Sequence, residues 1–123
     1  MTEKEDAPAK NEAAVLSDQS LKALAKEMVN QNKGLVYPMY LNIPTTQVVR
    51  MRLTGTEKEN SEEDMCTALL LYWKKMRETA RDKDKVLDLE RACRQMGELD
   101  IADTITDRHN NNMELSEDCF PAA

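Results

Sequence analysis

Apolar residues recur along this chain at the three- and four-residue spacing of amphipathic helices, and nowhere with the alternation typical of a strand. The first stripe predicts a helix that begins at a cap of Ser17 or Asp18 and ends at Gly34. A short second helix is expected around Pro38, because proline is tolerated in a first turn. A third helix is predicted to begin at Pro44.

The third helix should direct Val48, Met51 and Leu53 inward and end before a polar loop over residues 54–60. Ser61 then precedes three acidic residues, which favour the positive end of a helix dipole, so a fourth helix is predicted to begin there. Its apolar stripe runs as far as Met76.

Two further helices complete the pattern. Asp82 or Asp84 is expected to cap the fifth, and Gly97 to end it in the left-handed conformation that glycine adopts readily. Asp100 should cap a short sixth helix. The side chains expected to share one core are Leu24, Met28, Leu69, Trp73, Leu89 and Ile105.

These elements predict one all-α domain, a six-helix antiparallel bundle over residues 17–107. The flanking segments 1–16 and 108–123 have few apolar residues and an excess of acidic ones, so we expect disordered acidic tails. The chain of 123 residues has room for one such domain.

The second half of this pattern resembles a death domain, a small helical module that binds other copies of its own kind. In that family the fourth helix tends to carry two leucines followed by a tryptophan. Here Leu69 and Leu70 precede Trp73, which lies one position further on than usual. The order expected in the last two helices is matched by Leu89, Ala92, Gly97, Asp100, Ile101 and Ala102.

Upstream, residues 41–43 followed by Val48 and Met51 are similar to the turn and third helix of the family. The chain departs from the family where the second helix begins, because Gly34 and Leu35 stand where a tryptophan is common, and Pro38 is unusual there. The resemblance covers about residues 18–107. It implies a death-domain type of bundle without enzymatic activity.

The resemblance also implies a function: an adaptor in a cell-death or innate-immune type of signalling pathway. The N-terminal segment lacks the basic-then-apolar order of a signal peptide, so a cytoplasmic location is expected. The protein's partner would be another death-domain protein or further copies of itself, joined head to tail. The alternative is a helical scaffold or regulatory tail domain of a larger nuclear or cytoskeletal protein without a role in death signalling.

Charge supplies the candidate binding residues. The net charge is −6, but the tails carry most of it, and residues 21–107 are nearly neutral. A basic corner is expected between the fourth and fifth helices, at Lys74, Lys75, Arg77, Arg81 and Lys83. An acidic corner with Glu98 and Asp103 is expected between the fifth and sixth helices. Corners of opposite sign permit head-to-tail contacts, which do not close by themselves.

Catalytic chemistry is not indicated. The chain has one histidine, no glycine-rich phosphate loop and no ligand spacing, so neither a metal nor a cofactor is expected. Three cysteines without a pairing pattern predict reduced thiols, with Cys66 and Cys93 buried and Cys119 accessible. A pI near 4.9 disfavours nucleic-acid binding, and the absence of a long apolar run disfavours membrane insertion.

Overall fold

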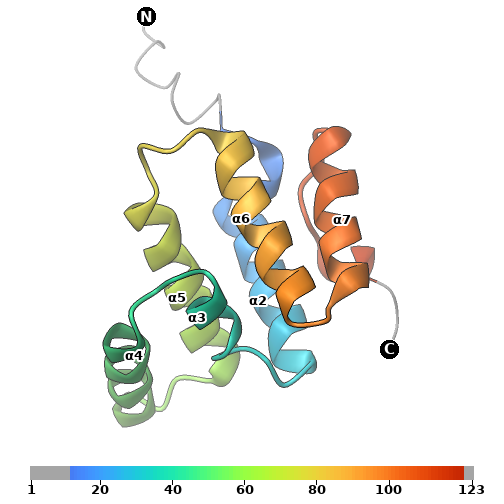
Figure 1. Cartoon of the computed structure of the whole chain (residues 1–123). Coiled ribbons are helices and arrows are strands. Elements are labelled where there is room, and N and C mark those ends of the chain that lie inside the picture. Colours follow the sequence, from blue (N-terminus) through green and yellow to red (C-terminus); the bar gives the residue numbers. More distant parts are fainter. Residues whose placement is uncertain (1–11, 121–123) are drawn as a thin grey trace, which may run out of the picture.

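The computed structural model describes residues 12–120, which form six α-helices, two short 3₁₀ helices and no strand (Figure 1). The elements in chain order are η2 (Ala14–Leu16), α2 (Asp18–Asn30), α3 (Tyr37–Tyr40), α4 (Thr45–Glu57), α5 (Glu62–Met76), α6 (Asp82–Gln95), α7 (Leu99–Asn110) and η3 (Glu117–Cys119).

Most helices end in the same way. The residue after the C-cap is left-handed, and two backbone hydrogen bonds close the last turn, as in α2, where the N–H of Lys33 donates to the carbonyl of Met28 at 2.8 Å. The left-handed residues are Asn32, Asn42, Glu59, Gly97 and Asn112. Gly97 is therefore the predicted C-cap glycine, with φ of 82°. The prediction that Gly34 ends the first helix is wrong, because Asn32 ends it.

Side-chain caps begin only some of the helices. Ser17 accepts a hydrogen bond from the N–H of Ser20 at 3.1 Å, and Ser61 does the same for α5. The expected caps of the last two helices are not used, because Asp82 and Asp84 lie inside the first turn of α6. The Asp82 carboxylate instead accepts a hydrogen bond from the N–H of Ala13 at 2.7 Å. Asp100 likewise lies inside the first turn of α7.

The helix α4 is longer than the sequence predicts. It continues through residues 54–57, where a polar loop was expected, and it turns Leu53 outward, with 61% of that residue exposed. The cause is Gly55, whose missing side chain lets α4 approach α5. A Cβ atom there would lie 2.5 Å from the Sδ atom of Met65. Leu53 is two residues away and therefore points to the opposite side of the helix.

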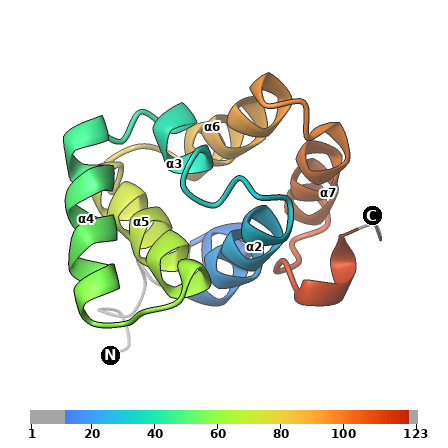
Figure 2. The ribbon, with the colours of Figure 1, turned by 90° about the horizontal axis from the view of Figure 1, so that it is seen from below.

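The core lies between α2, α5, α6 and α7, while α4 lies at the edge of the bundle beside α5 (Figure 2). The six side chains expected in the core are all fully buried: Leu24, Met28, Leu69, Trp73, Leu89 and Ile105. Tyr37 is buried with them, and its hydroxyl donates to the carbonyl of Leu89 at 2.9 Å, which joins α3 to α6.

Both ends of the described chain belong to the bundle. Val15 and Leu16 are fully buried, and so is Leu115, whose N–H donates to the hydroxyl of Ser20 at 2.9 Å. The expected disorder of residues 12–16 and 108–120 is therefore wrong, because α7 continues to residue 110 and the chain then folds back onto α2. The rest of both expected tails, residues 1–11 and 121–123, lies outside the described residues.

The three cysteines have different surroundings. Cys66 and Cys93 are fully buried, and burial raises the pKa of each thiol to about 12. Cys119 is partly exposed in η3, at the end of the described chain. Because the thiolate is the reactive form, the two buried thiols should be inert.

Replacing Trp73 by alanine should lower the free energy of unfolding by about 3–5 kcal/mol, because the substitution removes a fully buried indole and leaves a cavity. Thermal or urea unfolding measures the change. The matched control is Leu87→Ala on the outer face of α6, where about 0.5 kcal/mol or less is expected. Equal melting temperatures for Trp73→Ala and the parent would contradict the core described here.

A thiol reagent added to the native protein should modify Cys119 quickly and leave the other two cysteines unmodified until the protein unfolds. A Cys119→Ser variant should then show almost no fast labelling. Fast modification of Cys66 or Cys93 in the native state would mean that the contacts of α5 and α6 with the core open readily.

Candidate interaction surface

The basic corner is formed where α5 ends and the chain turns into α6. Lys74 and Lys75 occupy the last turn of α5, and Arg77 is its C-cap residue. Basic side chains at this end of a helix offset the negative pole of its dipole. Their presence here is therefore explained in part by α5 itself, and their ion pairs decide which of them remain available to a partner.

Lys74 is committed to the fold. Its ammonium lies 2.7 Å from a carboxylate oxygen of Glu12 and 3.0 Å from one of Asp18, and only 21% of its side chain is exposed. Burial lowers the pKa of Lys74, but the hydrogen bonds to the two carboxylates outweigh burial and raise it. Lys74 thus fastens the segment before α2 to the end of α5.

The other basic residues differ in their availability. Arg77 pairs with Asp88 at 2.9 Å, and Arg81 pairs with Asp84 at 3.2 Å. Lys75 lies 3.9 Å from Glu78 with 80% of its side chain exposed, so this pair contributes little.

Lys83 is exposed and makes no ion pair with any residue from 12 to 120. Of the five residues predicted for the basic corner, Lys75 and Lys83 are therefore the ones most available to a partner.

The acidic corner contains a similar mixture. Glu98 is mostly buried and pairs with Lys33, whose ammonium also donates to the carbonyl of Met96 at 3.3 Å, so Glu98 braces the turn between α6 and α7. Asp103 pairs with Arg94 at 2.8 Å but remains 68% exposed. Asp100 is exposed beside it. Asp100 and Asp103 therefore carry the accessible negative charge of this corner.

Each corner also carries an exposed apolar side chain. Met76 and Leu87 are 43% and 44% exposed near the basic corner, and Leu99 is 54% exposed in the first turn of α7. Sequence reasoning assigned Met76 to the core and did not single out Leu87 or Leu99. The sequence could have indicated both residues. Leu87 and Leu99 each lie among charged residues, at helical positions that fall outside the buried apolar stripe.

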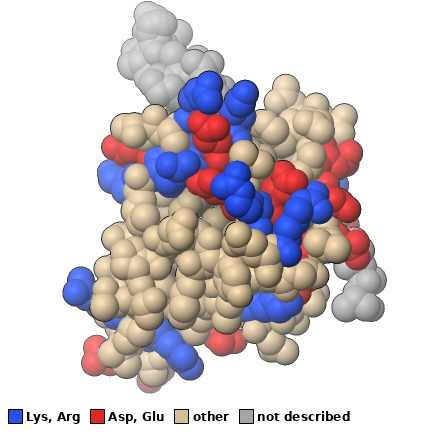
Figure 3. All heavy atoms as spheres, in the orientation of Figure 1, with Lys and Arg blue, Asp and Glu red and all other residues tan. Residues whose placement is uncertain are grey.

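The two corners lie at opposite ends of α6. This helix has 14 residues, so the corners are separated by about 20 Å. Charged side chains gather along α6 and its ends on the face shown in Figure 3. Figure 3 shows side chains of both signs intermixed along α6, and several of the named residues are paired within the chain. That the two signs occupy different places on the domain therefore stays a prediction.

A second surface lies over α3 and α4, where Figure 3 shows a broad area with few charged atoms. Nine large apolar residues are exposed within the described part of the chain, and five of them lie here: Val36, Met39, Tyr40, Val49 and Leu53. A concentration of exposed apolar side chains on a small domain is typical of a binding surface.

Comparison of the chain with protein-family models, with curated proteins and with solved structures finds no match. Between residues 12 and 120, no helix combines the length and the apolar character needed to cross a bilayer. Within the same range, no cluster of histidine, cysteine and carboxylate side chains has the arrangement of a metal site.

Proposed function

We propose that this protein is a non-enzymatic interaction module of the death-domain type, which binds a second helical bundle of its own kind. The pathway we propose for it is cell-death or innate-immune signalling, with the protein as a cytoplasmic adaptor. The order of sequence features from Leu69 to Ala102 supports the type of module, and the six-helix architecture is compatible with it.

The observation that carries the proposal is the pairing of accessible charge with accessible apolar surface at both ends of α6. Lys75 and Lys83 lie at the end with Met76 and Leu87, and Asp100 and Asp103 lie at the end with Leu99. An exposed ion pair contributes about 0–1 kcal/mol, so charges alone would not hold two domains together. The apolar residues supply the desolvated contact that such an interface requires.

The contact would be heterologous: the basic corner of one copy against the acidic corner of the next copy or of a partner. Contacts of this kind propagate into open or helical assemblies, because each added copy leaves one corner of each sign unoccupied. Signalling adaptors that act by assembly require this property. Binding should weaken as the ionic strength rises above the physiological range, where charges farther apart than about 8 Å are screened.

Reversing Lys75 and Lys83 to glutamate should abolish this association while the melting temperature stays near that of the parent, because neither residue braces the fold. Replacing Asp100 and Asp103 by asparagine should have the same effect, since Arg94 keeps its pair with Glu90. A mixture of the two variants should form a dimer that does not extend. Light scattering across a salt series measures each outcome.

The matched control is Arg52→Glu with Lys58→Glu, which makes the same change in net charge on exposed residues of α4 and its C-cap, outside both corners. This control should assemble like the parent. If the Lys75 and Lys83 variant assembles normally, or if the control fails as well, the corners are not the binding surface.

A further inference from the structure

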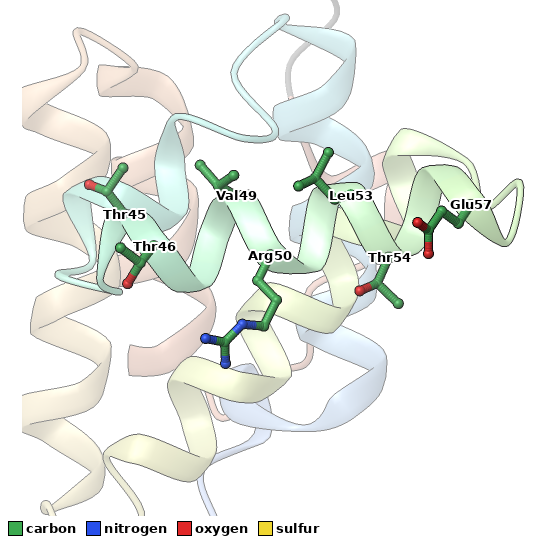
Figure 4. A pocket seen from close by; sticks show the side chains of 7 residues that line it. All are labelled: Thr45, Thr46, Val49, Arg50, Leu53, Thr54 and Glu57. Atoms are coloured by element: carbon green, nitrogen blue, oxygen red, sulfur yellow. The ribbon is translucent and has the colours of Figure 1, made fainter.

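The outer face of α4 carries a self-complementary arrangement of side chains. Arg50 and Glu57 lie on this face on either side of Leu53 and Thr54, and all four line the same shallow groove of about 520 Å³ (Figure 4). Along the helix, Arg50 precedes the midpoint between Leu53 and Thr54 by the same number of residues by which Glu57 follows it. Opposite charges thus flank an apolar centre symmetrically.

None of these side chains is needed to hold α4 in place. The residues that α4 directs toward the bundle are Val48, Met51 and Gly55, and they lie on the other side of the helix. Val49 and Leu53 are 48% and 61% exposed. Arg50 makes no ion pair within residues 12–120, nor does Glu57. The charges of this face are therefore available to a partner.

We propose that α4 is a two-fold dimerisation surface, on which the α4 helix of a second copy lies antiparallel. A two-fold axis through the midpoint near Leu53 places Arg50 of each copy beside Glu57 of the other. Leu53 and Thr54 of the two copies then meet between the ion pairs, and Val49 of each copy lies just outside them. A two-fold contact is isologous, so each favourable pair occurs twice and the same patch serves both partners.

The charges favour this occupant over others. An unrelated acidic helix would pair with Arg50 but would be repelled by Glu57. A basic helix would pair with Glu57 but would be repelled by Arg50. The parallel arrangement of two α4 helices would set Arg50 against Arg50. Among these arrangements, the antiparallel pairing of two copies is the one that satisfies both charges at once. The apolar side chains of α3 next to α4 can enlarge the contact.

This inference does not depend on the function proposed above, because α4 contributes to neither corner. The two contacts would nevertheless act together. The corners join copies head to tail without closing, and the α4 contact joins copies in closed pairs. A chain of copies that used both would be cross-linked into pairs of strands.

The test uses the full chain with Lys75→Glu and Lys83→Glu, so that the corner contact is removed. Sedimentation equilibrium should show a reversible dimer. Arg50→Glu alone, or Glu57→Arg alone, should raise its dissociation constant by about tenfold or more, because each places like charges together twice. The double variant Arg50→Glu with Glu57→Arg should dimerise like the parent, since the swap regenerates both pairs.

Mixing the two single variants gives the sharpest result. In the mixed pair, glutamates at 50 and 57 of one copy face arginines at 57 and 50 of the other, so a heterodimer tighter than either homodimer is expected. Arg52→Glu is the control: it makes the same change in charge on an exposed residue of α4 that does not line the groove. This control should leave the dimer unchanged, and circular dichroism should show every variant folded.

Three outcomes would overturn the proposal: a parent that stays monomeric up to millimolar concentration, a folded double variant that does not regain the dimer, or an Arg52→Glu variant as impaired as Arg50→Glu. If α4 fails these tests while the corner variants still abolish assembly, the head-to-tail function stands without the two-fold contact. If only the corner variants fail, the α4 dimer stands alone.

Discussion

The structure depends on two helix pairs, α2 with α5 and α6 with α7, which share one core in which Trp73 is fully buried. A domain of this size has little apolar surface to spare, so one large indole contributes a considerable share of its stability. The helices α3 and α4 and the segments at both ends then attach to this centre through a few specific contacts. Tyr37 bonds to the carbonyl of Leu89, and Ser20 links η2 to the C-terminal segment.

Ion pairs divide the charged residues into those that hold the fold and those left for binding. Lys74 and Glu98 hold segments of the chain together and are largely shielded, whereas Lys75, Lys83 and Asp100 extend into solvent. A surface charge is thus informative about binding only after its partner within the chain is known. The binding surfaces proposed here rest on the charges that remain accessible and on the apolar side chains beside them.

The proposed surfaces lie on different parts of the bundle, at the two ends of α6 and on the outside of α4. This separation follows from the shape of the fold. The helix α6 lies at the outside of the bundle between α3 and α7, while α4 contacts the rest mainly through α5 and leaves one whole side open. A small domain with several independent contacts of this kind can assemble in more than one direction.

The sequence by itself determined the number and order of the helices, the six core positions and the role of Gly97, because the 3.6-residue periodicity and the preference of glycine for left-handed backbone are local properties. The extension of α4 and the outward position of Leu53 depended on Gly55 meeting Met65, which is a contact between helices. The packing of residues 108–120 onto the bundle depended on single apolar residues, such as Leu115, whose spacing follows no helical period. The availability of each charged residue was likewise decided by tertiary structure, because partners such as Glu12 and Lys74 lie far apart in the chain and only the fold brings them together.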